Sequence, residues 1–514
     1  MIGPLLNMLP LRVRLPRFAK VTAILRQVQF AQADVTEHGH ASLAAIQSWS
    51  SVGGSLLTTT IAFENYPRAD AKTGTPIEVL SRRYEQRREK TLSLIAVPED
   101  QLLLLFRYNP NTYGRDTVDL FATHFVEILD RLAHDSQLKV EDILAPSAAE
   151  RERQLARWSH ADEALPEPDR LDLLIARQAS KQPDALAVSL GAATLTYGDL
   201  EQRAEMLADM LHEQGVGPEV RVGVCLDRSP EMAVACLAVM KAGGAFVPLD
   251  PQYPTKHLRD MLTYSDAPIV LTTTNLRGIL GDFRGVVLDM NTTFAGAGLR
   301  FRQSAGLDNA AYVSFTSGST GRPKASETTH RSATTYLGAL TRTYGLSQDD
   351  VVLQLASLSF DASVRDLLGP LIAGAHVVLV PADELGDAGA IAERVRAYGV
   401  TCLLSVVPSV ARAWTDWPDD LDSLQTVRLV LCSGETLHGS DCRQLRALFG
   451  GDVQIVNQYG PTETTMTATY HLVSEPELRL SALPVGRPFG GAEIYVLDDA
   501  LEVVPIGTPG EVFV

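Results

Sequence analysis

Residues 316–324, TSGSTGRPK, combine hydroxyl side chains, glycines and one lysine in a short run. Gly318 and Gly321 allow the backbone to turn several N–H groups toward one point, and Lys324 adds a positive charge. The hydroxyl donors of the run are Thr316, Ser317, Ser319 and Thr320. The glycines lie too close together for a Walker A loop, and Pro323 precedes the lysine. The run therefore predicts an anion-binding loop of another type, with a flexible surface loop as the alternative.

The elements around this run predict how it is positioned. Residues 310–315, AAYVSF, indicate a strand that leads directly into the loop. From about residue 170, short apolar strands alternate with helices, and Ser229 followed by Pro230 suits the start of one of those helices. Strands are predicted at 219–228, 245–250, 268–274, 377–380, 402–407 and 427–435, with a helix at 229–243. Strands that are apolar throughout imply a parallel sheet covered on both faces.

Length, charge and cysteine content restrict the class of protein. The chain has 514 residues, which exceeds a single hydrophobic core and implies two or more domains. Its 45 Lys and Arg against 62 Asp and Glu give a net charge of −17, which argues against nucleic acid as a partner. No run approaches the roughly 20 apolar residues of a membrane span. The five cysteines form no CxxC pair, a pattern typical of a reducing cytoplasm rather than of a disulfide framework or zinc site.

The texture of the sequence changes along the chain. Residues 1–147 mix strand-like runs such as 54–67 with a helical stripe at 117–135. Residues 148–169 are charged and end in PEPD, which predicts a short helix followed by an extended linker. We therefore place a domain boundary there, with the α/β pattern occupying residues 170–514.

The anion-binding run belongs to a series of motifs. TSGSTGRPK resembles the signature loop of adenylate-forming enzymes, in particular the adenylation domains of nonribosomal peptide synthetases. Five further motifs complete that family's order: LTYGDL (195–200), MKAGGAFVPLDPQYP (240–254), FDASV (360–364), NQYGPTETT (457–465) and GTPGEVFV (507–514). Six motifs in the family's order are far beyond chance agreement. The resemblance implies the large α/β N-terminal subdomain of an adenylation (AMP-binding) domain.

The first 147 residues show a resemblance of their own. MIGPLLNMLPLRV (1–13), HASLAAIQSWS (40–50), IAFENYP (61–67) and FRYNP (106–110) are similar to the C-terminal half of a condensation domain. The implied fold class is α/β: a chloramphenicol-acetyltransferase-like half domain, a linker, and then the adenylation subdomain. The HHxxxDG motif of condensation domains, the TGD motif and lysine-bearing C-terminal subdomain of adenylation domains, and a carrier-domain serine are missing. We therefore expect a fragment of a larger synthetase that adenylates poorly by itself.

The resemblance implies a reaction and its cofactors. ATP and an amino acid form aminoacyl-AMP with release of pyrophosphate, and the aminoacyl group is then loaded onto the phosphopantetheine thiol of a carrier protein. The implied cofactors are ATP and Mg²⁺, with phosphopantetheine only through a carrier domain. The implied ATP contacts are Thr316, Ser317, Gly318, Ser319, Thr320, Gly321, Lys324, Gly434, Glu435, Asn457, Tyr459, Gly460 and Thr462. Among them, Tyr459 would stack on adenine and Asn457 would hydrogen-bond its edge.

The catalytic positions implied by the family are Thr316, Lys324, Thr462 and Glu463. Lys324 would supply charge at the β- and γ-phosphates, and Thr462 would contact the α-phosphate, where charge develops as the carboxylate attacks. Glu463 would hold Mg²⁺, which needs hard oxygen ligands. A second interpretation makes GPTE a turn with Thr462 as a helix N-cap and Glu463 in the first helical turn. Both interpretations can hold together.

The substrate pocket is also implied by the family. Asp361 would bind the α-ammonium group of the substrate, although an isolated aspartate could equally cap the helix behind it. The pocket positions are Asp361, Ala362, Arg365, Ser405, Leu431, Ser433, Gln458, Met466 and Thr467. Arg365 departs from the aromatic residue often found there and suggests a polar substrate, with acidic amino acids as candidates. The alternative is that Arg365 pairs with Asp366 or Glu435 and only narrows the pocket.

Two other functions stay open at this point. An acyl-CoA or aryl-acid ligase shares the adenylation chemistry, but it has no ammonium group to bind, so Asp361 argues against it. A catalytically inactive chain that only binds nucleotide or docks to partner domains is the other class. The expected partners are the amino acid, a carrier protein and neighbouring synthetase domains. One local departure is Ala325, where the family usually has glycine, and its Cβ would restrict the loop if φ must be positive.

Overall fold

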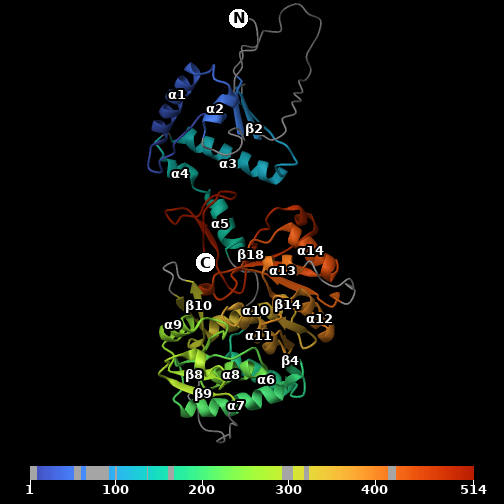
Figure 1. Cartoon of the computed structure of the whole chain (residues 1–514). Coiled ribbons are helices and arrows are strands. Elements are labelled where there is room, and N and C mark those ends of the chain that lie inside the picture. The colour runs from blue at the N-terminus through green and yellow to red at the C-terminus, as the bar shows by residue number, and fades with distance from the viewer. Residues whose placement is uncertain are drawn as a thin grey trace, which may run out of the picture. The chain divides into compact units, whose positions relative to one another are not determined.

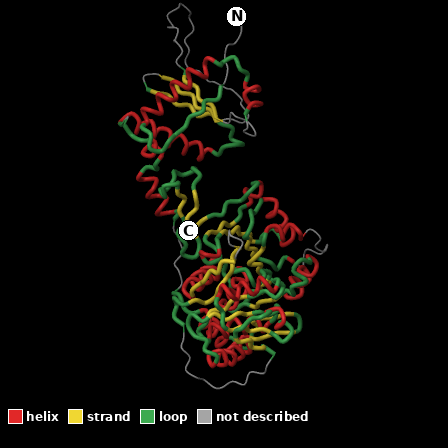
Figure 2. The backbone as a smooth tube through the Cα atoms, turned by 60° about the vertical axis from the view of Figure 1, so that its left-hand side comes forward, coloured by secondary structure: helices red, strands yellow, loops and turns green. Residues whose placement is uncertain are grey.

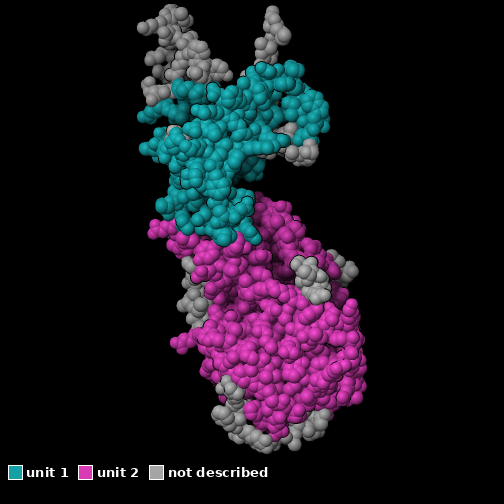
Figure 3. Space-filling view, turned by 90° about the vertical axis from the view of Figure 1, so that its left-hand side faces the viewer, with its two compact units in different colours: residues 1–151, 496–511 teal, residues 152–495, 512–514 magenta. Residues whose placement is uncertain are grey.

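The computed structural model describes residues 9–50, 59–64, 92–98, 101–135, 137–159, 167–291, 305–317, 323–414 and 424–514. The chain divides into two compact units, which are coloured separately in Figure 3 and described separately below. Unit 1 comprises residues 1–151 and 496–511, and unit 2 comprises residues 152–495 and 512–514. The division falls inside helix α5 (Ala148–Arg157), at the start of the segment expected to link two domains.

Unit 1 is an α/β unit built on a three-stranded sheet of order β1-β2-β3. β1 runs parallel to β2, whereas β2 and β3 are antiparallel. The strands are β1 (Thr59–Phe63), β2 (Leu92–Pro98) and β3 (Leu102–Arg107), and Figure 1 shows them with helices α1 (Val21–Glu37), α2 (Leu43–Trp49), α3 (Arg115–His134) and α4 (Val140–Leu144). The helical stripe expected at 117–135 is α3, and the strand expected within 54–67 is β1. Residues 54–58 and 65–67 lie outside the described residues.

Unit 2 contains two large sheets, each parallel except at its edges. The first has the order β11-β10-β7-β6-β8-β9 and is antiparallel only between β10 and β11. The second has the order β18-β17-β16-β15-β14-β12-β13-β4-β5, with antiparallel pairs at its two ends. The parallel sheet predicted from apolar strands is thus present as two sheets, and the antiparallel edges were not predicted.

The strands predicted in unit 2 are all present: most are shorter than predicted, β13 is shifted by one residue, and β10 extends two residues beyond the predicted 310–315. The first sheet contains β6 (Arg221–Val224), β7 (Ala245–Pro248), β8 (Ile269–Thr272), β9 (Val286–Asp289), β10 (Ala310–Ser317) and β11 (Pro323–Thr329). The second contains β4 (Leu186–Leu190), β5 (Ala193–Thr196), β12 (Val351–Gln354), β13 (His376–Leu379), β14 (Cys402–Val406), β15 (Leu429–Cys432), β16 (Gln454–Tyr459), β17 (Thr469–Leu472) and β18 (Arg487–Pro488). Two further short strands are β19 (Tyr495–Leu497) and β20 (Glu511–Phe513).

Helices cover both faces of each sheet in unit 2, and Figure 2 shows them interleaved with the strands. One buried cluster joins both sheets to α6 (Leu171–Lys181), α7 (Tyr197–Glu213), α8 (Pro230–Lys241), α10 (His330–Thr343) and α11 (Ala362–Ala373). A second joins the nine-stranded sheet to α12 (Ala388–Tyr398), α13 (Pro408–Ala413) and α14 (Gly439–Phe449). A third joins the six-stranded sheet to α9 (Thr255–Ser265) and the short helix η1 (Arg277–Leu280). No helix among the described residues is long and apolar enough to cross a membrane.

Helix α8 shows why its sequence is apolar on every side. It packs against β4 of one sheet and against β6 and β7 of the other, so no face is left for solvent. Its last residue, Lys241, is buried, and its ammonium group binds Glu201 Oε1 (2.5 Å) and Glu205 Oε1 (2.7 Å). Pro230 opens the helix as predicted, whereas Ser229 occupies the N-cap position without a side-chain capping hydrogen bond.

Candidate functional site

Three neighbouring parallel strands bring part of the predicted pocket together. β14, β15 and β16 are adjacent in the nine-stranded sheet and run in the same direction. Ser405 lies on β14, Leu431 on β15 and Gln458 on β16, and all three are buried. Ser433 follows directly after β15 and is partly buried. Their positions near the carboxyl ends of parallel strands match the edge at which open α/β sheets bind ligands.

The two ends of the predicted anion loop form a β-hairpin. Thr316 on β10 pairs with Lys324 on β11 in antiparallel register. The tip of the hairpin, with Gly318, Ser319, Thr320 and Gly321, lies outside the described residues. Lys324 Nζ lies 3.9 Å from Glu463 Oε1, and the two side chains are 68% and 44% exposed. The hairpin therefore places the loop lysine beside the GPTE turn.

The expected conflict at Ala325 is not present. Ala325 lies within β11, opposite Phe315 of β10, and it is not among the described residues with positive φ. Extended backbone is open to any L residue, so an alanine causes no strain at this position. Ser317 is the last residue of β10, at the point where the chain enters the undescribed tip.

Asp361 lies immediately before α11 and connects two of the sequence motifs. The side chain of Thr462 lies near its carboxylate, which brings FDASV and GPTE together. The backbone of Asp361 is already helical (φ −56°, ψ −28°), and its side chain makes no capping hydrogen bond, so the alternative role as helix cap is not supported. Burial raises the pKa of Asp361, while the side chain of Thr462 and the nearby charge of Arg365 lower it. Ala362 follows as the first residue of α11.

Arg365 is the centre of a buried polar cluster. It is 1% exposed, and its Nε and Nη2 donate to Ser405 Oγ at 3.2 and 2.9 Å. Nη1 donates to Gln458 Oε1 at 2.7 Å and makes a longer contact with Thr467 Oγ1 at 3.3 Å. Nη2 also contacts Ser433 Oγ at 3.3 Å. Four predicted pocket residues thus bind the arginine that was predicted beside them.

The two carboxylates considered as partners of Arg365 are held by other groups. Asp366 accepts hydrogen bonds from Ser405 Oγ and from the backbone N–H groups of residues 355 (3.2 Å) and 356 (3.1 Å). Glu435 accepts hydrogen bonds from Ser409 Oγ (2.7 Å) and Arg412 Nη2 (3.2 Å). A direct ion pair between Arg365 and Asp366 or Glu435 is therefore not what compensates the arginine, and Ser405 bridges it to Asp366 instead.

The residues expected at adenine lie at the end of β16 and after β15. Tyr459 is 44% exposed, which leaves a ring face open to stacking. Asn457 is buried, and its Nδ2 donates to Pro484 O (2.9 Å) and Leu483 O (3.5 Å). Any contact of Asn457 with a base would therefore use its side-chain oxygen. Gly434 has a φ of 90°, a conformation that favours glycine.

A strained turn follows β16. A Cβ added to Gly460 would lie 2.5 Å from Ala468 N and 2.7 Å from Met466 O, so only glycine allows this close backbone approach. Thr465 and Met466 both have positive φ (65° and 67°), which is uncommon for residues other than glycine. Such conformations concentrate at functional sites. The turn delivers Met466 and Thr467, both buried, to the cluster around Arg365.

The GPTE turn is the short helix η4 (Thr462–Thr464). Pro461 occupies its N-cap position, so the interpretation of Thr462 as the N-cap was wrong by one residue, and Glu463 lies in the first turn as predicted. No group of three or more His, Cys, Asp or Glu suited to a metal ion occurs among the described residues. Mg²⁺ that is bound by one carboxylate together with phosphate oxygens needs no such cluster. The partly exposed Glu463 beside Lys324 fits that mode of binding.

Two tyrosines complete the cluster and were not predicted. Tyr336 on α10 donates from its hydroxyl to Thr467 Oγ1 (3.1 Å), and its OH lies 3.4 Å from Arg365 Nη1. Tyr344 accepts a hydrogen bond from Gln458 Nε2 (3.1 Å). No motif marks either tyrosine. The available signal was their spacing of eight residues in a helical pattern, which places both on one face of a helix.

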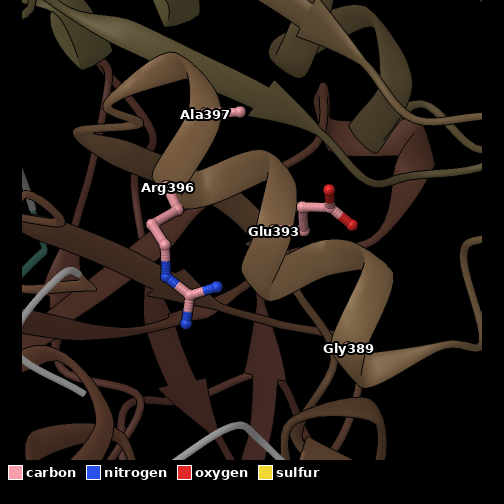
Figure 4. Close-up of a pocket in the computed structure, with 4 residues that line it drawn as sticks. All are labelled: Gly389, Glu393, Arg396 and Ala397. Carbon is pink, nitrogen blue, oxygen red and sulfur yellow. The ribbon is translucent and has the colours of Figure 1, made fainter. Parts of the chain in front are cut away.

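The surface pocket shown in Figure 4 lies away from these residues. It is lined by Gly389, Glu393, Arg396 and Ala397 of α12. The side chains of Glu393 and Arg396 leave the helix in different directions, and no predicted site residue lines the pocket. We assign it no part in the chemistry of the site.

Comparisons with known proteins agree with this geometry. Residues 175–514 match the model of the AMP-binding enzyme family, and residues 1–155 match the condensation domain model. One of the linear gramicidin synthase proteins of Brevibacillus parabrevis is 32% identical over 100% of the chain, which spans 6% of that protein. Bacitracin synthase 3 of Bacillus licheniformis is 29% identical over 99% of the chain, which spans 8% of it.

Solved structures of nonribosomal peptide synthetases have the same fold as this chain. The nonribosomal peptide synthetase FmoA3 in its alpha-methyl-L-serine-AMP bound form has a TM-score of 0.77 and 26% identity. The likeness covers 97% of this chain and 57% of that one. A four-domain nonribosomal peptide synthetase bound to AMP and glycine has a TM-score of 0.80 at 22% identity, which supports the fold alone. The predicted fold class is therefore confirmed. The chain belongs to the AMP-binding enzyme family, in the form found in nonribosomal peptide synthetases.

Proposed function

We propose that this chain activates an amino acid for nonribosomal peptide synthesis. A carboxylate oxygen of the amino acid attacks the α-phosphorus of ATP, the bond to the β-phosphate oxygen breaks, and aminoacyl-AMP and pyrophosphate form. The observation that carries this proposal is the proximity of the Thr462 side chain to the Asp361 carboxylate, whose pKa it lowers. This proximity joins a residue expected at the α-phosphate to a residue expected at the substrate ammonium group, as a reaction between the two ligands requires.

Asp361 distinguishes amino-acid activation from activation of a plain carboxylic acid. A partly buried carboxylate beside the Thr462 side chain has lone pairs that can bind a cation. The α-ammonium group of an amino acid supplies that cation, whereas an acyl or aryl acid would leave the aspartate uncompensated. FmoA3, whose structure this chain resembles, was solved with an aminoacyl adenylate, which supports the same assignment.

The phosphate side of the site uses the hairpin and the GPTE turn. Lys324 would neutralise charge on the β- and γ-phosphates, and Thr316, Ser317 and the loop that follows would donate hydrogen bonds to them. When bound, Mg²⁺ would supply positive charge that stabilises the negative charge of the phosphates. Glu463 would hold that ion, and Thr462 would hydrogen-bond the α-phosphate.

The surroundings of the site support three further parts of the proposal. The matched ranges 1–155 and 175–514 favour a condensation-type segment at 1–147, a linker at 148–169 and an adenylation segment at 170–514. A carrier protein bearing phosphopantetheine would accept the aminoacyl group, and neighbouring synthetase domains would be the other partners. The five cysteines are free and buried, which fits a reducing cytoplasm.

Amino-acid-dependent exchange of labelled pyrophosphate into ATP tests the proposal. Exchange above background is expected with at least one amino acid and not with plain carboxylic acids of similar size. In the Asp361→Asn variant, kcat/KM for the amino acid should fall about 100-fold, because a desolvated charge pair loses a partner. Asp308→Asn is the matched control, since Asp308 is 80% exposed and pairs with Arg331 at the surface. Equal exchange with plain carboxylic acids would contradict the proposal.

A further inference from the structure

The donors of the pocket arginine are already used by the protein. A guanidinium group has five N–H donors, on one Nε and two Nη atoms. Each of the three nitrogens of Arg365 donates to a side chain of the site: Ser405, Ser433, Gln458, Thr467 and, at longer range, Tyr336. A substrate carboxylate would have to displace these acceptors and leave them unpaired in a buried cluster, which is costly. Arg365 is therefore poorly placed to receive an acidic side chain.

The buried charges balance without a charged substrate side chain. Asp366 is fully buried, which raises its pKa, while the charge of Arg365 and the hydrogen bonds from Ser405 and two backbone N–H groups favour its ionised form. Ser405 bridges this negative charge to Arg365, so the two compensate each other. Asp361 is then left to pair with the α-ammonium group. An acidic side chain would add an unpaired negative charge, and a basic one would approach Arg365 with like charge.

The side chain of Arg365 cannot move aside to accommodate a large substrate side chain. Tyr336 contacts Arg365 and Tyr344 contacts Gln458, and the rings of both tyrosines pack against Phe489 at centroid distances of 5.7 and 6.0 Å. Tyr470 packs against the same phenylalanine at 5.3 Å. Phe489 is 1% exposed, and interiors packed in this way leave no space for a displaced guanidinium. Arg365 is thus held in a fixed position within the cluster and acts as a wall of the pocket.

Resting on the proposed function, we propose that this site selects an amino acid with a small, uncharged side chain, of the size found in glycine, alanine or serine. Arg365 is the specificity-determining residue because it fills the space that a longer side chain would occupy. This inference replaces the expectation of an acidic substrate, which required guanidinium donors that were free to bind it. The acceptors Ser405, Gln458 and Thr467 act on specificity through Arg365 by fixing its position.

Calorimetric titration of the full chain with sulfamoyladenosine mimics of aminoacyl-AMP tests this inference. The panel contains the glycyl, alanyl, seryl, glutamyl, leucyl and phenylalanyl compounds, and 5′-sulfamoyladenosine without an aminoacyl group. One of the three small compounds should bind at least ten-fold more tightly than the glutamyl, leucyl and phenylalanyl compounds. Tightest binding of the glutamyl, leucyl or phenylalanyl compound would overturn the inference. If no compound binds, the unsubstituted one included, the proposed function itself fails and this inference with it.

An Arg365→Met variant tests the wall directly, since methionine is two atoms shorter than arginine and lacks its forked end, its charge and its N–H donors, so it opens space while staying apolar. The ratio of leucyl to alanyl affinity should rise at least five-fold relative to the unmodified chain. Arg394→Met is the control: Arg394 binds Glu384 at 2.7 Å on another part of unit 2, and its loss should leave the ratio unchanged. An unchanged ratio in a folded Arg365→Met variant would overturn the assignment of the wall. If that variant does not fold, the ranking on the unmodified chain decides the question.

Discussion

Units 1 and 2 differ in how strongly their large apolar side chains are exposed to solvent. In unit 1, several are from 64% to 75% exposed: Phe18, Phe30, Trp49, Ile61 and Phe63. Among the described residues of this unit, the buried apolar side chains are few: Val21 and Ile24 on α1, Leu92 and Leu94 on β2, and Val118, Val140 and Val504. In unit 2, the most exposed described side chain of this kind is Phe360, at 59%, and it precedes Asp361 at the candidate site.

This difference indicates that the units are stabilised in different ways. Unit 2 has three extensive buried clusters that cover both faces of its two sheets. Unit 1 leaves Ile61 and Phe63 exposed on β1, the edge strand of its sheet, and exposed apolar surface of this kind is typical of interaction sites. We therefore expect unit 1 to open at lower denaturant concentration than unit 2.

A pair of matched core substitutions tests this difference with the largest expected effect. Leu94→Ala in unit 1 and Leu403→Ala in unit 2 each remove a leucine that is 3% and 0% exposed, respectively. Each should lower the free energy of unfolding of its own unit by about 2–5 kcal/mol, from lost burial and the cavity left behind. Hydrogen exchange measured by mass spectrometry across a urea series would follow each unit separately. Equal effects of both substitutions on both units would show that the units do not unfold independently.

The stability of unit 2 should also depend on pH, with an effect smaller than that of the core substitutions. Burial lowers the pKa of His330 to about 4, with Asp172 raising it and Arg170 lowering it. Between pH 6.5 and about 4 the folded state binds fewer protons than the unfolded state, so stability falls as pH falls through this window. At pH 5 this lowers the free energy of unfolding of unit 2 by about 2 kcal/mol relative to pH 7. His330→Gln should remove that part of the loss between pH 7 and pH 5. An identical loss in the variant would contradict the assignment.

The smallest expected effect concerns the ion pair at the site. Lys324 and Glu463 are exposed and 3.9 Å apart, and exposed pairs at this distance contribute little to stability. Lys324→Gln should change the free energy of unfolding of unit 2 by less than about 0.5 kcal/mol, while pyrophosphate exchange falls. This outcome would show that Lys324 contributes to the reaction and, unlike the core residues, not to the stability of the fold. A loss of unfolding free energy comparable to that of Leu403→Ala would contradict that separation.

Much of unit 2 was predictable because local patterns and tertiary structure agree there. Strands that are apolar throughout predicted sheets covered on both faces, and α8, buried between two sheets, shows the same rule for a helix. The resemblance to adenylation domains implied one site for Asp361, Arg365, Gln458 and Thr467, and the structure brings them together. These site residues came from the resemblance, whereas the strands and helices were predicted from local apolar patterns.

The parts that could not be predicted depend on contacts between distant segments. The sequence offered Asp366 and Glu435 as partners of Arg365 because they carry the opposite charge, but neutral hydroxyl and amide groups surround the arginine instead. Tyr336 lies 29 residues from Arg365, and no motif links them. The predictions of a helix-cap role for Asp361 and of strain at Ala325 were both wrong. Each depends on backbone angles, which residue types do not determine.

The central claim is that Asp361 makes unit 2 a site for amino acids rather than for plain acids. The most direct measurement compares, by calorimetry, the aminoacyl sulfamoyladenosine that binds most tightly with its counterpart lacking only the amino group. The account predicts at least about 50-fold tighter binding of the amino compound, and a ratio close to one in the Asp361→Asn variant. Equal binding of the two compounds to the unmodified chain would contradict the account and favour activation of a plain carboxylic acid.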